Sequence, residues 1–150
     1  MIEYRIATDN DIELLMSSRL EMLKVVNDLP QDYVYSDEIV NESRDYFLNG
    51  DQVTVLALDG DVVAGCTSMS FMRIMPTFSH PTGKRAHLMN VYIRSDYRRQ
   101  GIARKMVNML IDETWKRGAT EISLDATTMG RPLYESLGFT NSTEGMVLTR

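Results

Sequence analysis

The sequence predicts one α/β domain, and three patterns within its 150 residues support this prediction. In the first, two β-rich runs, "QVTVLAL" and "VVAGCTSMSFM", flank a tight Asp-Gly turn and form a hairpin pattern. In the second, an amphipathic helical pattern follows a short first strand. In the third, the order strand, helix, strand occupies 86–93, 100–117 and 121–126. Because crossovers of this kind are right-handed, the two strands should lie parallel in one sheet.

In the N-terminal half, periodicity and cap signals define the other elements. Alternation in "IEYRIA" predicts a first strand over 2–7. Asp9 or Asp11 can cap the next helix, which "NDLP" ends. The apolar positions at helical spacing in it are Ile12, Leu15, Met16, Leu20, Leu23 and Val26. A second, shorter helix should run from its Ser36 cap to Leu48.

In the C-terminal half, loop and helix-stop residues separate the elements. "MPTFSHPTGKR" holds two prolines and a glycine, and predicts a loop before the strand at 86–93. Helical spacing of apolar residues predicts a helix over 100–117, which Gly118 ends. "GRPLYESL" predicts a short helix with Pro132 in its first turn. "EGMVLTR", residues 144–150, predicts a last strand.

Composition narrows the classes of protein and partner. Hydrophobic residues at 43% and charged residues at 25% are typical of a globular domain. A net charge of −5 argues against a nucleic-acid partner. Cys66 is the single cysteine, which excludes an internal disulfide, and we expect it to be a buried strand thiol. The only histidines are His80 and His87, so the sequence has no Cys/His cluster with the spacing of a zinc site. No apolar run approaches the roughly 18 residues of a membrane span, and the N-terminus lacks an apolar signal core. We therefore expect a cytoplasmic protein with no metal, nucleic-acid or membrane partner.

The stretch "VYIRSDYRRQGIARKM" at 91–106 carries the strongest functional signal. It passes from a strand to a helix start, where backbone N–H groups lack partners and the helix dipole is positive. Gly101 removes a side chain at this point, and Ala103 keeps the next turn slim. Four basic residues surround this glycine: Arg98, Arg99, Arg104 and Lys105. The pattern suits a pyrophosphate site, although an ordinary helix start with a solvated basic edge has the same residues. Neither a Walker loop nor a G-x-G-x-x-G motif is present.

These residues also carry a family resemblance. "YRRQGIARKMV" after "NVYI" resembles the acetyl-CoA-binding motif of the GNAT superfamily of N-acetyltransferases, Arg/Gln-x-x-Gly-x-Gly/Ala, matched at Arg98, Gly101 and Ala103. "RPLYESLGF", residues 131–139, resembles the later helix of the superfamily. The order and spacing of both segments match, and the resemblance covers nearly the whole chain. It implies a single GNAT domain over 1–150, with a mixed, twisted central sheet flanked by helices.

The resemblance also implies how acetyl-CoA would bind. The pyrophosphate would lie on backbone N–H groups across Arg99–Arg104, and the pantetheine arm would pair like an extra strand with Val91–Ile93. Many members carry an asparagine about seven residues before the helix tyrosine, but here Thr127 stands there; its hydroxyl can still donate and accept. The implied cofactor-binding residues are Val91, Tyr92, Ile93, Arg98, Arg99, Gln100, Gly101, Ile102, Ala103, Arg104, Thr127 and Tyr134.

Three side chains are candidates for catalysis. Tyr134 aligns with the tyrosine that GNAT enzymes often use as general acid toward the CoA sulfur, or it simply packs beside Leu133. His87 is the best-placed general base, but it could be a structural strand histidine, with ordered water taking the proton. Asn90 could orient a water or a substrate carbonyl. A backbone N–H near Val91 could bind the thioester oxygen.

The acceptor is less clearly indicated. In the superfamily, substrates usually approach over segments corresponding to 24–40 and 74–85. An acidic set there would attract a cationic amine, or it is a solvated helix face; its members are Asp28, Asp32, Asp37, Glu38, Glu42 and Asp45. The leading hypothesis is transfer of acetyl from acetyl-CoA to a primary amine of a small molecule or peptide. The alternatives are a non-catalytic acyl-CoA-binding sensor or accessory domain and a module that docks an acidic partner. Homodimers are common in the superfamily, so a homodimer is possible by analogy.

Overall fold

The fold is one five-stranded sheet with helices on both faces. The computed structural model describes residues 1–142 and 144–150. The strands are β1 (Glu3–Ile6), β2 (Gln52–Asp59), β3 (Val62–Arg73), β4 (Lys84–Ile93) and β5 (Glu121–Ser123), in the spatial order β1-β2-β3-β4-β5. The longer helices are α1 (Ile12–Val26), α2 (Asp37–Asn49), α3 (Ile102–Lys116) and α4 (Arg131–Ser136), and two short 3-10 helices lie at Asp9–Asp11 and Ser95–Tyr97. Neighbouring strands are antiparallel except β4 and β5, which are parallel as the strand-helix-strand pattern predicted.

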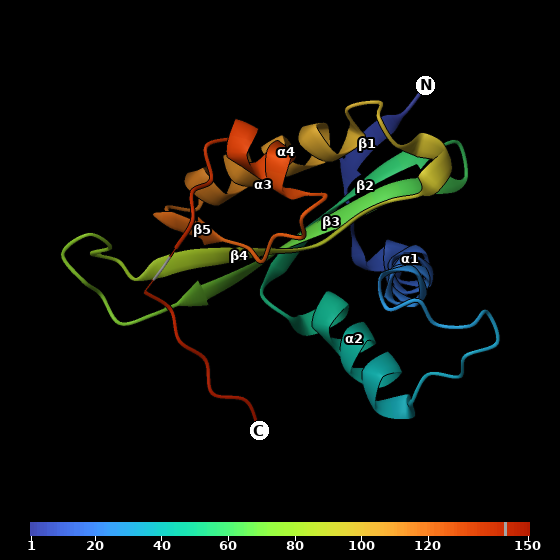
Figure 1. Ribbon diagram of the computed structural model, residues 1–150, viewed down its shortest axis with the longest axis horizontal. Coiled ribbons are helices and arrows are strands. Elements are labelled where there is room, and N and C mark those ends of the chain that lie inside the picture. Colours follow the sequence, from blue (N-terminus) through green and yellow to red (C-terminus); the bar gives the residue numbers. More distant parts are fainter. Residues whose placement is uncertain (143) are drawn as a thin grey trace.

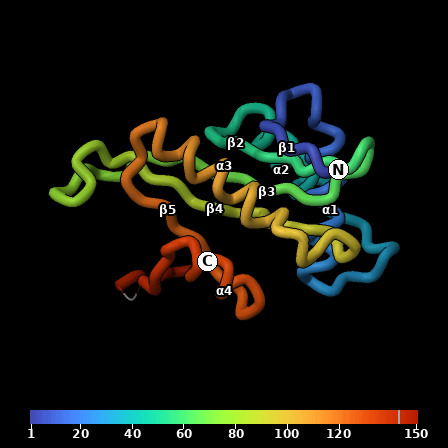
Figure 2. The backbone as a smooth tube through the Cα atoms, turned by 90° about the horizontal axis from the view of Figure 1, so that it is seen from above, coloured from blue at the N-terminus to red at the C-terminus, as the bar shows by residue number. Residues whose placement is uncertain are grey.

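The two faces of the sheet carry different helices. Helices α1 and α2 lie below the sheet in Figure 1, and α3 and α4 lie above it. Seen from above, α4 lies on the β5 side of the sheet, away from β1 (Figure 2). Because successive strand residues point to opposite faces, each face has its own core. The α3 side buries Val55, Met69, Leu88, Met106 and Leu110 among others. The opposite side buries Leu15, Met16, Phe47, Leu56, Leu58 and Cys66.

Local signals explain where most elements begin and end. The Ser36 hydroxyl accepts a hydrogen bond from the backbone N–H of Ile39, which caps α2 as predicted. The β2–β3 turn is closed by Gly60 at a φ of 60°, a conformation that glycine adopts without strain. The Cys66 thiol is buried in β3, as expected. The hairpin, the four helices and the first four strands confirm the α/β prediction.

Two expectations about the C-terminal part were wrong. Strand β5 ends at Ser123 instead of Ala126. Residues 144–150 form no strand, and Met146, Val147 and Leu148 are 96%, 94% and 101% exposed. The physical reason is that an apolar, β-prone pattern becomes a strand only when it pairs with an edge and buries one face. This segment has no such partner in the part of the chain that the structure describes.

Asp11 also has a different role from the predicted helix cap. Its carboxylate binds the Arg5 guanidinium through two hydrogen bonds of 2.6 and 2.7 Å and accepts a third from the backbone N–H of Thr8. These interactions hold the pKa of Asp11 at about 2. The carboxylate therefore joins β1 to the start of α1. Across the described residues, no helix combines the length and apolar character needed to cross a membrane.

Candidate active site

Strands β4 and β5 pair over only three rungs and then separate. The parallel pairs are Arg85 with Glu121, Ala86 with Ile122 and His87 with Ser123. Strand β5 ends there, whereas β4 continues to Ile93. The β4 edge from Leu88 to Ile93 therefore has no strand partner on the β5 side in the described chain. Its N–H and C=O groups can pair with an extended ligand, and this edge includes the segment predicted to hold pantetheine.

A β-bulge lies in the middle of this open edge. Ser68 pairs with Met89 and Cys66 pairs with Tyr92, so two residues of β4 oppose one residue of β3. One of the two, Asn90, has a φ of 60°, which is uncommon for a residue with a side chain. Backbone outliers of this kind are frequent in functional sites because the surrounding structure must hold them in place.

The side chains around the bulge hold it in this conformation. The Asn90 Oδ1 accepts a 3.1 Å hydrogen bond from Arg19, and its Nδ2 lies 3.5 Å from the Cys66 sulfur. Tyr92 is buried, and its hydroxyl donates a 2.9 Å hydrogen bond to Glu21. Burial, with this hydrogen bond to Glu21 next, raises the pKa of Tyr92 to about 12. The Tyr92 hydroxyl therefore stabilises the contact between β4 and α1 and is not free to bind a ligand.

The loop before α3 forms a cradle of backbone N–H groups. Arg99 and Gly101 have φ values of 62° and 77°. The first N–H of the helix with a backbone acceptor is that of Lys105, bonded to Gly101 at 3.1 Å. The N–H groups of the first turn, Ile102–Arg104, have no acceptor among the described residues. A Cβ added at Gly101 would meet no atom beyond its chain neighbours within 4 Å, so the space beside Gly101 is open. An anion of phosphate size fits this arrangement.

The basic side chains of the motif do not all converge on Gly101. The Arg98 Nε donates to the Ile93 carbonyl at 3.2 Å, and Arg104 donates to the Ser136 hydroxyl of α4 at 2.5 Å. Lys105 lies over the Tyr4 ring of β1, 6.0 Å from its centroid. The four basic side chains therefore do not form the expected cluster. Lys105 lies on the side of α3 that faces Tyr4 and points away from the Gly101 loop. The backbone donors, together with the exposed Arg99 and Gln100, remain at the loop.

Tyr134 lies in α4, and Thr127 lies in the segment just before this helix. The Tyr134 ring is half-buried against the α3-side core, with the Phe139 ring edge-on at 6.0 Å, so it does have the packing role that was considered. Its hydroxyl makes no hydrogen bond to a described residue, and burial raises its pKa, so the hydroxyl stays protonated. The Thr127 hydroxyl accepts a 3.1 Å hydrogen bond from the N–H of Gly130 and keeps its own proton to donate.

His87 occupies the last rung before β4 and β5 separate. Its Nδ1 lies 2.7 Å from the Ser123 hydroxyl, and its Nε2 lies 3.7 Å from the Asp125 carboxylate. The imidazole is therefore held at the apex of the opening between the strands. An imidazole next to a carboxylate is an arrangement suited to accepting a proton.

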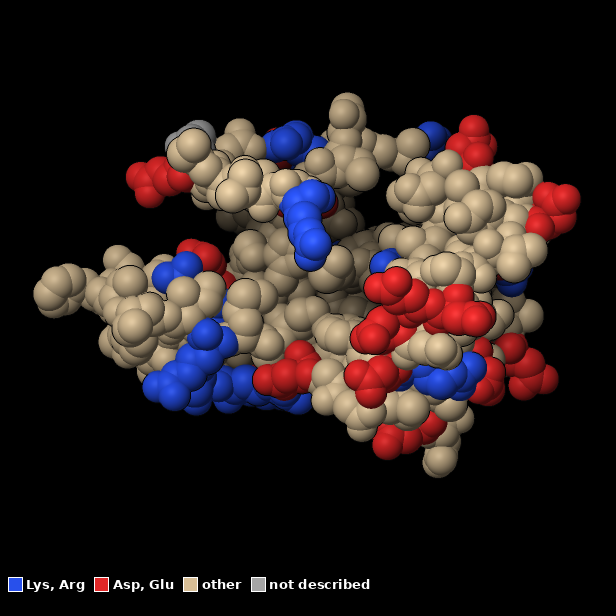
Figure 3. All heavy atoms as spheres, turned by 90° about the horizontal axis from the view of Figure 1, so that it is seen from below, with Lys and Arg blue, Asp and Glu red and all other residues tan. Residues whose placement is uncertain are grey.

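A cavity of about 270 Å³ lies on the other side of the bulge, between α1, α2 and the sheet. Its lining residues are Arg19, Glu42, Ser43, Tyr46, Phe47, Ser68, Ser70, Met89 and Asn90. Seen from below, this face of the molecule is hollowed near its centre, and acidic side chains gather over α2 beside the hollow (Figure 3). Of the predicted acidic set only Glu42 lines the cavity, and the segments 24–40 and 74–85 contribute none of its lining.

Sequence reasoning missed Arg19, Tyr46, Ser68 and Ser70. One signal was available, since Arg19 stands on the apolar stripe of α1, four residues after Leu15 and four before Leu23. A charged residue on such a stripe is unusual. Ser68 and Ser70 alternate with apolar residues on a buried strand, and the Ser70 hydroxyl is bonded to that of Tyr46. The partner residues come from different elements, so only the fold identifies them as one cavity.

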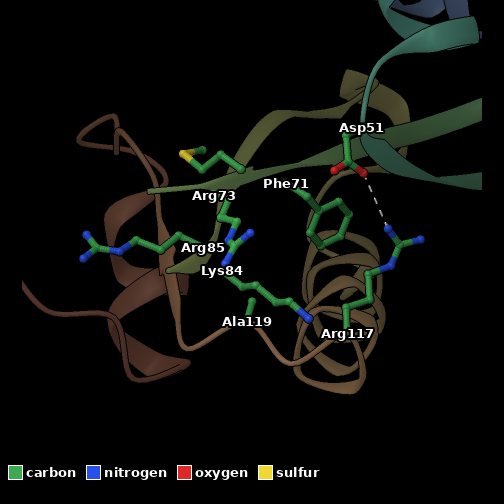
Figure 4. A pocket seen from close by; sticks show the side chains of 8 residues that line it. Asp51, Phe71, Arg73, Lys84, Arg85, Arg117 and Ala119 are labelled. Atoms are coloured by element: carbon green, nitrogen blue, oxygen red, sulfur yellow. Dashed lines mark ion pairs between the residues drawn. The ribbon is translucent and has the colours of Figure 1, made fainter. Parts of the chain in front are cut away.

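A second cavity, of about 320 Å³, lies at the far end of α3. Figure 4 shows Arg117 next to Asp51, 3.8 Å apart, with Phe71, Arg73 and Lys84 around the space. Arg117 follows the C-terminus of α3, whereas Gly101 precedes its N-terminus, and 15 residues of helix span about 22 Å. This cavity is therefore separate from the β4 bulge and the Gly101 loop.

Comparisons with known proteins agree with this geometry. The model of the acetyltransferase (GNAT) family matches residues 20–139, which is most of the chain. The ribosomal protein bS18-alanine N-acetyltransferase of Escherichia coli K12 is 41% identical over 61 residues, 39% of this chain and 41% of the relative. The match thus spans less than half of that relative. Glucosamine 6-phosphate N-acetyltransferase of Arabidopsis thaliana is 24% identical over 105 residues, 70% of this chain and 68% of the relative.

Among solved structures, a predicted acetyltransferase of Clostridium acetobutylicum with acetyl-CoA has a TM-score of 0.87 and 29% identity. The similarity covers 99% of this chain and 96% of that one. The family match, the mixed sheet with its parting β4 and β5, and the Gly101 cradle lead to one conclusion: the chain belongs to the GNAT acetyltransferase family.

Proposed function

We propose that this protein is an acetyl-CoA-dependent N-acetyltransferase that acts on a primary amine. The main supporting observation is that the Gly101 cradle, the open β4 edge and the bulge at Asn90 follow one another along the chain, with a cavity beside the bulge. The structural neighbour with acetyl-CoA and the N-acetyltransferase relatives support the same reaction class. Cytoplasmic location and a homodimer stay predictions.

The residues present fit acetyl-CoA in three ways. The free N–H groups of Ile102–Arg104 would hold the pyrophosphate, and the left-handed Gly101 keeps a side chain out of its way. The open edge of β4 would pair with the pantetheine amides. Since the Ile93 carbonyl is already bonded to Arg98, this pairing falls to the residues before Ile93. The Thr127 hydroxyl proton is available for one further hydrogen bond.

Acetyl transfer would use three groups of this chain, each for a different part of the reaction. Acetyl-CoA supplies a thioester, at whose carbonyl carbon the amine forms a C–N bond while the C–S bond breaks. The bulge would direct the Val91 N–H to the thioester oxygen, where negative charge develops. The Tyr134 hydroxyl, protonated and without a described partner, would donate its proton to the departing sulfur. His87, beside Asp125 at the apex of the opening, would take the proton of the amine directly or through water.

Asn90 has a structural contribution besides the predicted orientation of a water or a carbonyl. Both ends of its amide contact the protein, at Arg19 and at Cys66. Its main contribution would be to hold the bulge, and its function in orienting a water or a carbonyl stays a prediction.

Two measurements test the proposal. At about 100 times its dissociation constant, acetyl-CoA should stabilise the fold by about 2.7 kcal/mol in a thermal-shift titration. Release of free CoA thiol should then depend on an added amine. No stabilisation would refute the cofactor site. Stabilisation without thiol release across polyamines, amino acids, amino sugars and peptides would favour the sensor or accessory domain.

A further inference from the structure

Arg19 is the unusual residue of the cavity between α1, α2 and the sheet, where we expect the acceptor to bind. It projects from the apolar stripe of α1 toward the sheet, and burial lowers its pKa. Other partly buried arginines pair with carboxylates: Arg5 with Asp11 at 2.6 Å and Arg85 with Glu121 at 3.4 Å. Arg19 has no carboxylate partner in residues 1–142 and 144–150. A cation that is partly shielded from water and has no counter-ion attracts an anion, so Arg19 is a candidate for binding an anionic ligand.

The hydrogen-bonding groups of Arg19 are only partly used. One terminal nitrogen, Nη1, donates to Asn90 at 3.1 Å and contacts the Met22 sulfur at 3.4 Å. Nη2 and Nε have no hydrogen-bond acceptor among the described residues. A guanidinium offers its N–H groups as a planar fork that matches a carboxylate or a phosphate. The remaining donors are thus suited to an oxyanion in the cavity.

The place of Arg19 relative to the bulge sets the distance between that oxyanion and the reacting amine. Arg19 donates a hydrogen bond to Asn90, which both lines the cavity and lies in the bulge of β4. An amine at the bulge with an anion on Arg19 must carry the anion within a few bonds of its nitrogen. Glu42, the one acid of the lining, lies in α2 and would face a positive or polar remainder. The hydroxyls of Ser43, Tyr46 and Ser70 suit a polar acceptor.

We infer that the acceptor is a small amine that carries an oxyanion close to the reacting nitrogen, and that Arg19 is the residue that binds this oxyanion. This inference rests on the proposed function and narrows it. The oxyanion is either the carboxylate of a free α-amino acid or a phosphate carried a few bonds from the amine. A peptide N-terminus has no anion in this position and would leave Arg19 unpaired.

The test compares matched ligands and matched variants. Binding is measured by calorimetry with free CoA present, and turnover by thiol release with acetyl-CoA. Each anionic amine is paired with its neutralised form: amino acids with their amides and with short peptides, and phosphoethanolamine with ethanolamine. The wild type should bind the preferred anionic amine at least tenfold more tightly than its neutral counterpart. The preferred pair identifies carboxylate or phosphate as the source of the anion.

Arg19→Gln should abolish this preference, and Arg19→Lys should restore part of it. The control is Arg44→Gln, because Arg44 pairs with Glu13 and does not line the cavity. Stabilisation by acetyl-CoA reports whether the bulge is intact in each variant. If Arg19→Gln loses it, Arg19→Lys decides the test, because a lysine can keep a hydrogen bond to Asn90. If neutral amines or peptides bind as tightly as anionic amines, the inference is overturned. It is also overturned if Arg19→Gln lowers the affinity for anionic and neutral amines equally. Both outcomes would leave the acetyltransferase proposal standing. Absence of any amine-dependent thiol release would overturn the proposed function itself.

Discussion

Substitution of Gly101 by alanine tests the cradle directly. Gly101 has a φ of 77°, and a residue with a Cβ in this left-handed region costs about 1–2 kcal/mol. The added methyl group would meet no protein atom within 4 Å, so the packing of the free protein should not change. For a chain of this size, 1 kcal/mol corresponds to about 2–4 °C in Tm. The free variant should therefore melt lower by roughly 2–8 °C.

The effect on acetyl-CoA should be separate and larger. If the methyl group holds the pyrophosphate away from even one of the N–H donors, the lost hydrogen bond to a charged group is worth about 1.5–3 kcal/mol. This corresponds to an affinity loss of roughly ten- to a hundredfold. At a concentration that stabilises the wild type by about 2.7 kcal/mol, the variant would then gain only about 1.4 to 0.4 kcal/mol.

Gly60→Ala is the matched control. Gly60 has a φ of 60° in the β2–β3 turn, and a Cβ there also meets nothing within 4 Å. Both variants should lose similar stability without ligand, because the backbone strain is similar. Only Gly101→Ala should lose stabilisation by acetyl-CoA in the thermal-shift titration. Equal ligand stabilisation of the two variants would show that the pyrophosphate does not lie over Gly101.

Three other predictions concern named side chains. Tyr134→Phe should lower turnover by roughly 10²- to 10⁴-fold with acetyl-CoA stabilisation retained; since burial raises the pKa of Tyr134 above 10.0, wild-type turnover should lose this acid only at still higher pH. Unchanged turnover would remove Tyr134 from the mechanism. His87→Ala should lower turnover by roughly 10²- to 10⁴-fold with acetyl-CoA stabilisation retained, and unchanged turnover would exclude His87 as the base. Asp11→Asn should cost about 1–2 kcal/mol at pH 7, because the folded-state pKa of about 2 lies below the ordinary 3.8 and the contact with the partly exposed Arg5 is partly screened. This contribution is complete well above pH 3.8 and is lost as pH falls toward 2, so urea-unfolding free energies of wild type and variant should converge in acid, with Asp9→Asn as the control.

Much of the fold follows from local signals that can be recognised in the sequence. The Asp-Gly turn at Gly60 makes the hairpin, the Ser36 hydroxyl starts α2, and the helix after Gly101 is amphipathic. Each of these depends on residues within a few positions of one another, so the pattern alone is sufficient. The same holds for the Gly101 loop, whose donors are adjacent in the chain.

Features that depend on a distant partner could not be read in this way. The strand pattern of 144–150 has the required residues but no edge to pair with, and β5 stops at Ser123. Lys105 belongs to the basic motif in the sequence, yet it lies on the side of α3 that faces β1 and is placed over the Tyr4 ring. The bulge at Asn90 is visible only in the register between β3 and β4.

By itself, the sequence determined the α/β class, the family motif and the backbone cradle around Gly101, because these are encoded by neighbouring residues. Tertiary structure alone decided which side chains form the acceptor cavity. Arg19, Tyr46, Ser70 and Asn90 come from four different elements and meet only when α1 and α2 pack across the sheet. The periodicity of a helix specifies which of its faces is buried. The residues that this face contacts, and the surroundings of the charged Arg19 side chain, depend on where the other elements lie.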